Sequence, residues 1–162
     1  MITSFSKMDK SSRVWIYQSD RKFLDFELKE IEESLSFFLN NWTAHGSELQ
    51  TAYKIKYNRF IIIALNESNT SATGCSIDKC VYFVQELEAK YGVNLLDKMN
   101  ISFKQGEYVS YKSINDFKKL VKNKSVSKKT IVFNNLVVDI QDFNKNWEIP
   151  AEKSWHARFF NS

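Results

Sequence analysis

The sequence predicts an α+β protein whose first hundred residues follow the order β-α-β-β-α-β of a ferredoxin-like sheet. Three observations carry this prediction. Two segments, 25–41 and 76–91, repeat apolar residues at helical spacing, and the segments between them alternate or are rich in β-branched residues. The composition is 15% aromatic, with 4 glycines and 1 proline. A chain this aromatic can bury a substantial core, which excludes extensive disorder and collagen-like or linker-like chains.

The elements of this sheet follow one another with short connections. In the first helix the apolar residues are spaced by three and four, and Asp25 is a candidate cap. The segment 59–65 is continuously apolar, as expected of a central strand covered on both faces. The predicted order is strand 13–17, helix 25–41, strands 49–57 and 59–65, helix 76–91 and strand 100–104.

The chain after residue 106 predicts a small C-terminal α/β extension. It contains a hairpin partner at 107–111, a short helix at 114–121, strands at 130–133 and 136–138 and a last helix at 139–147. We expect one α+β domain over 13–160, with a small subdomain over 107–160 as the alternative. Residues 1–12 are polar and are expected to be a flexible N-terminal tail.

The net charge of +4 has a local origin. The window 118–129 holds six lysines and no acid, and the rest of the chain is slightly acidic. Such a patch can bind RNA, DNA or an acidic protein, but it lacks interleaved aromatic residues, so we interpret it mainly as a solvated face.

The N-terminus has no apolar leader segment, and the longest aliphatic run, 60–65, is far shorter than the ~20 residues that span a bilayer. We therefore expect a cytoplasmic protein with two reduced cysteines, Cys75 and Cys80, and no membrane partner. The oligomeric state is not predicted.

Five short segments resemble a known family. They are Trp42-Thr-Ala-His-Gly46, Tyr57-Asn-Arg-Phe60, Gly74-Cys-Ser-Ile-Asp-Lys79, Thr130-Ile-Val-Phe-Asn-Asn-Leu136 and Ser154-Trp-His-Ala-Arg158. They look like a family of short uncharacterised bacterial proteins whose members are often labelled ABC transporter ATPase or ABC-ATPase. The resemblance runs from about Arg13 to Phe160 and implies no activity, substrate or catalytic residue.

The glycines argue against a nucleotide-binding loop. A P-loop needs two glycines five residues apart, followed by Lys and Ser or Thr, so that backbone amides can wrap the phosphates. The glycines here, at 46, 74, 92 and 106, are too far apart for this loop and for the Rossmann fingerprint. We therefore expect neither a P-loop ATPase nor a bound cofactor.

The most informative segment is the helix start at Thr73-Gly74-Cys75-Ser76. A helix N-terminus offers free N–H groups and positive partial charge, and Gly74 lets a ligand approach the backbone closely. The segment can cradle an anion, or present Cys75 as a nucleophile. The simpler interpretation is that Thr73 or Ser76 caps the helix and Cys75 fills space.

A catalytic cysteine also needs a base, and His45 and His156 are the only imidazoles. Asp78 is a candidate third member, although an acid in a first helical turn is equally explained by the helix dipole. The spacing of the two cysteines does not match a zinc knuckle, so we expect no metal site.

The remaining candidate residues would form the walls of a pocket at the helix start. They are Arg59 and Arg158, as an anion clamp, with Trp42 and Trp155. Two functions stay open: a protein that binds a small ligand or a partner through the helix start at 73–78, and a small thiol-dependent hydrolase or transferase with Cys75 as nucleophile. An adapter that uses the lysine patch is a third.

Overall fold

The protein is described by a computed structural model, in which residues 1–161 are placed. The chain divides into two compact units. Unit 1 comprises Met1–Leu96 and Val138–Gln141, and unit 2 comprises Asp97–Val137 and Asp142–Ser162. The α+β class is confirmed, and the division begins near residue 97 rather than at 107.

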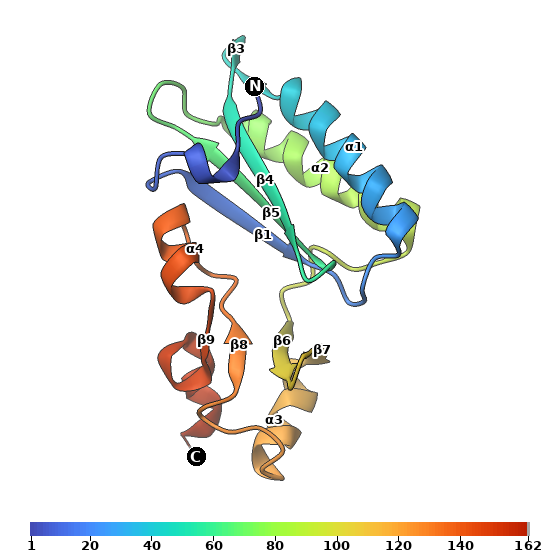
Figure 1. Cartoon of the computed structure of the whole chain (residues 1–162), viewed down its shortest axis with the longest axis vertical. Helices are drawn as coiled ribbons and strands as arrows, with labels where there is room; N and C mark the ends of the chain where they lie inside the picture. The colour runs from blue at the N-terminus through green and yellow to red at the C-terminus, as the bar shows by residue number, and fades with distance from the viewer. Residues whose placement is uncertain (162) are drawn as a thin grey trace. The chain divides into compact units, whose positions relative to one another are not determined.

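Unit 1 is built on a three-stranded antiparallel sheet of β1 (Arg13–Gln18), β4 (Gln50–Lys56) and β5 (Phe60–Asn66). The order is β1-β5-β4, so β5 is central (Figure 1). Six of its seven residues are buried, which confirms the central strand expected from its continuous apolar run.

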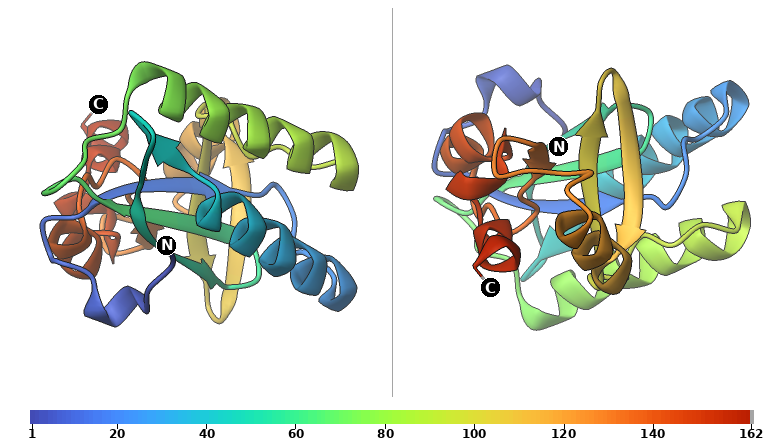
Figure 2. Two further views of the ribbon diagram at one scale, coloured as in Figure 1. Left: turned by 90° about the horizontal axis from the view of Figure 1, so that it is seen from above. Right: turned by 90° about the horizontal axis from the view of Figure 1, so that it is seen from below.

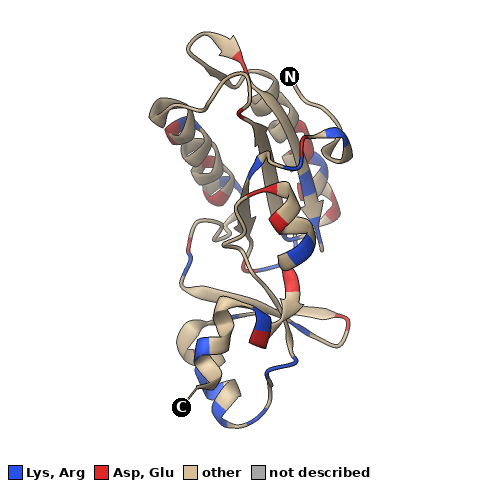
Figure 3. Ribbon diagram, turned by 90° about the vertical axis from the view of Figure 1, so that its left-hand side faces the viewer, with Lys and Arg blue, Asp and Glu red and all other residues tan. Residues whose placement is uncertain are grey.

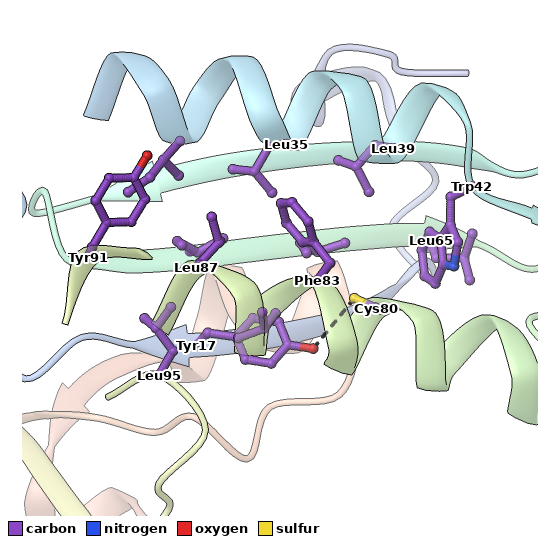
Figure 4. Close-up of a cluster of buried hydrophobic side chains, with 14 of the residues drawn as sticks. Tyr17, Leu35, Leu39, Trp42, Leu65, Cys80, Phe83, Leu87, Tyr91 and Leu95 are labelled. Atoms are coloured by element: carbon purple, nitrogen blue, oxygen red, sulfur yellow. Dashed lines mark hydrogen bonds between the residues drawn. The ribbon is translucent and has the colours of Figure 1, made fainter. Parts of the chain in front are cut away.

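Two helices, α1 (Asp25–Asn40) and α2 (Gly74–Tyr91), cover one face of this sheet (Figure 2). Leu35 and Leu39 of α1 and Phe83 and Leu87 of α2 point toward the sheet and form its core with Leu65 (Figure 4). Leu35 and Leu87 lie on the apolar stripes predicted by the helical periodicity of the sequence, whereas Leu39 and Phe83 lie beside those stripes.

The start of α1 differs from the prediction in one detail. Asp25 is the first helical residue, and the cap is supplied by Glu27, whose carboxylate accepts a hydrogen bond from the backbone N–H of Leu24 at 2.8 Å. Arg21 donates two more bonds to the same carboxylate, at 2.8 and 2.9 Å. These bonds hold the pKa of the buried Glu27 carboxyl at about 2 and keep it ionised.

The ferredoxin-like order is matched by the first three strands only. In that order the fourth strand would pair with the free edge of the first. Here β6 (Asn100–Gln105) instead joins the sheet of unit 2. The edge of β1 is met by the segment at 138–139, through an Arg13–Asp139 bridge and a bond from Val14 N–H to the carbonyl of Val138 at 3.0 Å.

The N-terminal residues, expected to form a flexible tail, are hydrogen-bonded to unit 1. The amino group of Met1 donates to the carbonyl of Leu49 at 2.9 Å, and Ile2 forms a parallel bridge with Thr51. A short 3-10 helix, η1 (Phe5–Lys7), follows, and the ammonium of Lys54 lies 4.7 Å from the ring centroid of Phe5.

Unit 2 contains a four-stranded antiparallel sheet in the order β7-β6-β8-β9. Its core joins Ile101 and Phe103 of the sheet to Phe117 of a helix and to the C-terminal aromatic residues. Besides β6, its elements are β7 (Tyr108–Ser113), α3 (Ile114–Lys122), β8 (Ile131–Phe133), β9 (Glu148–Pro150) and the 3-10 helices η2 (Ala151–Lys153) and η3 (Trp155–Phe160); α4 (Ile140–Asn146) precedes β9.

One C-terminal expectation is corrected. The β-branched segment at 136–138 is not a strand, although Val138 accepts the bond from β1 described above. Pro150 is the last residue of β9. Across residues 1–161, no helix is both long and apolar enough to cross a membrane.

Candidate functional site

A groove of about 970 Å³ lies between α1 and α2 of unit 1. We call it the α1–α2 groove. It contains three of the predicted site residues, Trp42, Cys75 and Asp78. Its other lining residues are Glu30, Glu33, Ser34, Phe37, Phe38, Asn41, Thr43, Lys79, Tyr82, Phe83, Glu86 and Lys90.

The floor of the groove is aromatic. Phe38 of α1 stacks on Phe83 of α2 with ring centroids 4.5 Å apart and planes 9° apart, and it lies 5.5 Å from the ring of Trp42. Trp42 and Phe83 are buried. Stacked aromatic pairs are favourable beyond the area that they bury, so the three rings form one packed apolar surface.

Two further aromatic side chains flank this floor and face solvent. Phe37 is 75% exposed and Tyr82 is 63% exposed. Exposed large apolar side chains beside a hollow are typical of interaction surfaces, because water contact costs roughly 25 cal/mol for each Å² of apolar area.

The charged residues of the groove are predominantly acidic. Four acids, Glu30, Glu33, Asp78 and Glu86, line it against two lysines, Lys79 and Lys90. Glu30 is engaged within the groove, since it accepts a bond from the hydroxyl of Tyr91 at 3.1 Å and lies 3.9 Å from the ammonium of Lys90. The acids therefore give the groove a net negative charge.

At the start of α2, the hydroxyls predicted to bind a ligand bind the protein itself. Thr73 is the N-cap, and its side chain accepts a bond from the N–H of Ser76 at 3.0 Å. The hydroxyl of Ser76, a buried residue, donates to the carbonyl of Thr43 at 2.9 Å, and the indole of Trp42 donates to the carbonyl of Ser76 at 2.8 Å. This network ties the helix start to the chain after α1.

Gly74 and Cys75 are both exposed at this helix start. Gly74 has an ordinary negative φ, and a side chain there would meet open space, so neither conformation nor crowding requires a glycine. Cys75 faces the groove beside Asp78 and Lys79. Cys80, in contrast, is a core residue, as the sequence suggested.

His45 occupies a tight turn between two short strands. The strands β2 (Thr43–Ala44) and β3 (Ser47–Glu48) form a small hairpin, and His45 and Gly46 are its two turn residues, both with positive φ. This is the pattern of a type I′ turn. His45 is exposed and is not among the residues that line the groove.

Arg59 lies away from the helix start. It precedes the first residue of β5, whereas the loop that leads to Gly74 follows the last. Arg59 is buried, and its backbone bonds to Ser19 and Lys56. The structure therefore does not bring its guanidinium to the groove.

Trp155, His156 and Arg158 belong to η3 in unit 2. His156 is buried, stacks on Trp155 at 4.0 Å, and its Nδ1 shares a hydrogen bond with the hydroxyl of Ser154 at 2.7 Å. Burial lowers the pKa of His156 to about 4, so the ring is neutral at pH 7. The guanidinium of Arg158 lies 5.5 Å from the ring of Trp155. The predicted site is thus divided between the two units.

The sequence analysis missed the exposed aromatic residues, although a signal was present. Phe37 and Tyr82 fall outside the apolar stripes of their helices, on faces that are otherwise polar. An aromatic residue on the wet face of an amphipathic helix is a recognisable sign of an interaction surface. No family model, curated protein or solved structure matches the chain.

Proposed function

We propose that this chain is a binding protein whose α1–α2 groove holds a cationic, amphipathic helical segment of a partner protein. The observation that carries the proposal is the pairing of a buried aromatic floor with the exposed rings of Phe37 and Tyr82. Such a surface gains free energy when an apolar face covers it.

The dimensions of the groove suit a helix. Its lining residues on α2 run from Cys75 to Lys90, about 22 Å along the axis at 1.5 Å per residue. A partner helix of about four turns matches that length, with apolar residues at i, i+3, i+4 and i+7 as anchors. A small metabolite would leave most of the aromatic surface exposed.

The charges select among possible helices. The acidic lining disfavours an anionic ligand and favours lysine or arginine on the polar face of the partner. A second observation argues against an anion site at the helix start. The backbone N–H of Ser76, which an anion would need, already donates a hydrogen bond to the side chain of Thr73.

The thiol-dependent alternative has one supporting observation, the exposure of Cys75 on the wall of the groove. Among the groove's described lining residues there is no histidine, so a base for Cys75 is lacking there. A Cys75→Ser variant separates the two functions, because we expect it to bind a partner helix as the natural chain does.

The proposal is tested with a defined probe, a fluorescein-labelled 14-residue amphipathic helix that carries leucine on one face and lysine on the other. We expect saturable binding by fluorescence anisotropy, and at least tenfold weaker binding for the same peptide with glutamate in place of lysine. The double variant Phe37→Ala/Tyr82→Ala should lower the affinity for the lysine peptide at least tenfold, since truncated aromatic anchors typically cost 1–3 kcal/mol.

A matched control replaces two equally exposed aromatic residues outside the groove, as Phe26→Ala/Tyr108→Ala. Phe26 is 62% exposed and Tyr108 is 76% exposed. Equal losses in the two double variants, or tighter binding of the glutamate peptide, would contradict the proposal.

A further inference from the structure

The two units differ in charge. Unit 1 holds eleven Lys and Arg against thirteen Asp and Glu, a net charge of −2. Unit 2 holds twelve against six, a net charge of +6. In Figure 3 the charged positions on the ribbon near the C-terminus are mostly blue, the colour of Lys and Arg. The basic character of the chain therefore belongs to unit 2 alone.

Within unit 2, five exposed cations gather around η2, η3 and α3, and we call them the basic face. They are Lys118, Lys122, Lys128, Lys153 and Arg158. None of them forms an ion pair within residues 1–161. The nearby acids are taken by other lysines: Asp116 by Lys119 at 3.7 Å and Glu152 by Lys129 at 2.6 Å.

Several contacts hold these cations close together. Lys118 and Lys122 are one helical turn apart on α3, and the ammonium of Lys118 lies 6.0 Å from the ring of Phe159. The hydrogen bond from Lys129 lowers the pKa of the Glu152 carboxyl, and the nearby charges of Lys153 and Lys128 lower it further. Charges placed this closely repel one another, a cost that an anionic ligand would relieve.

The fold also supplies the aromatic residues that the lysine window lacks in sequence. Phe159 and Phe160 of η3 pack against Phe117 of α3, and Trp155 packs against Phe159. All three side chains are half-buried. The guanidinium of Arg158 and the ammonium of Lys118 lie over the rings of Trp155 and Phe159. Two of the five cations of the basic face are therefore placed beside aromatic rings.

From this arrangement we infer that the basic face of unit 2 binds single-stranded nucleic acid. Phosphates meet the unpaired cations, and bases, whose faces are open only in a single strand, stack on the half-exposed rings and on Arg158. An acidic peptide satisfies the cations but makes no use of the rings. The inference concerns a surface separate from the α1–α2 groove and does not depend on it.

The test is the binding of a fluorescein-labelled 12-residue oligodeoxythymidylate, followed by anisotropy between 50 and 200 mM salt. We expect binding that weakens steeply with salt. The triple variant Lys118→Gln/Lys122→Gln/Arg158→Gln should bind at least tenfold more weakly at 100 mM salt. Its slope of log K against log salt should be shallower by about 2, because each lost contact with a single strand removes about 0.7.

The matched control removes three exposed lysines of the same unit from other elements, as Lys98→Gln/Lys112→Gln/Lys145→Gln. The control variant carries the same net charge as Lys118→Gln/Lys122→Gln/Arg158→Gln. We expect its affinity for the oligonucleotide to stay within threefold of that of the natural chain. Equal weakening in the two triple variants would overturn the inference, because it would show a response to net charge only.

Two competition experiments test the same inference with the natural chain alone. Unlabelled oligonucleotide should displace the probe at a concentration at least tenfold lower than polyglutamate of equal charge, and the annealed duplex should compete less well than the single strand. Displacement by polyglutamate at the same concentration, tighter binding of the duplex, or no binding at 50 mM salt would each overturn the assignment.

Discussion

Cys75 and Cys80 lie on the same helix but differ in the properties that govern thiol reactivity. Cys75 is exposed on the wall of the groove, whereas Cys80 is 3% exposed in the core. The sulfur of Cys80 lies 3.7 Å from the hydroxyl of Tyr17 (Figure 4), and burial raises the pKa of its thiol to about 11. A buried, protonated thiol reacts slowly with alkylating reagents.

Iodoacetamide at pH 8 should therefore add one carbamidomethyl group to the folded chain, at Cys75. Cys80 should react only after unfolding in urea. Peptide mapping by mass spectrometry identifies the modified residue, and Cys75→Ser should abolish labelling of the folded chain. Labelling of Cys80 in that variant without urea would contradict the placement of this thiol in the core.

The lysine peptide should also slow the labelling of Cys75, because a peptide that occupies the groove covers the wall on which Cys75 lies.

His156 gives unit 2 a sensitivity to acid. A histidine in an unfolded chain takes up a proton near pH 6.5, but the folded chain resists protonation until about pH 4. Between these values the unfolded state binds more protons, so this residue makes the folded state less stable as the pH falls from about 6.5 to about 4. Below pH 4 both states are protonated and the effect stops growing.

The ring protons of His156 should accordingly titrate in NMR spectra with a midpoint near pH 4. The urea midpoint of the natural chain should fall between pH 6.5 and 4.5, and His156→Gln should reduce that fall. A midpoint near 6.5 for His156 would show that the ring is accessible and would contradict its burial beside Trp155.

Among the elements, α1 and α2 were predictable because helical periodicity is a local property of the sequence. The pairing of strands is not local. The segment at 100–105 forms a strand and pairs with β7 in the hairpin expected from the sequence, but its second partner, β8, is set by contacts in unit 2 rather than by its place after α2. A β-α-β-β-α-β order therefore did not determine the sheet that the last strand joins.

The candidate site, like the fold, could be predicted from the sequence only in part. Trp42, Cys75 and Asp78 do line one groove, because one side of that groove is the first turn of α2. Arg59 and His156 could not be placed from sequence, since their positions depend on the direction of β5 and on the division into two units. The spacing of these residues along the chain gives no information on the direction of β5 or on the division into two units.

A substitution of Ser76 tests the structural role of the helix start. Its hydroxyl joins α2 to the carbonyl of Thr43 and also lies 2.9 Å from the hydroxyl of Thr73. Removing it in Ser76→Ala leaves the partly buried carbonyl of Thr43 without this partner, so we expect a loss of about 1 kcal/mol in the free energy of unfolding. Urea denaturation measures this loss. Affinity for the lysine peptide should change less than threefold; a tenfold loss with unchanged stability would assign Ser76 to binding.

At the scale of the whole molecule, opposite charges are segregated into the two units. The acidic unit 1 presents an aromatic groove for a cationic helix, and the basic unit 2 presents rings and cations suited to an anionic strand. Neither surface resembles a phosphate-binding loop, because the four glycines of the sequence are too far apart to form one.

The most direct test of the central claim is a titration of the ¹⁵N-labelled chain with the lysine peptide, followed by ¹H–¹⁵N correlation spectra. We predict that the largest shifts fall on amides of α1 and α2 between residues 30 and 43 and between 75 and 90, together with the indole N–H of Trp42. Shifts that fall mainly in unit 2, or that stay equally large in Phe37→Ala/Tyr82→Ala, would contradict the claim that the groove is the binding site.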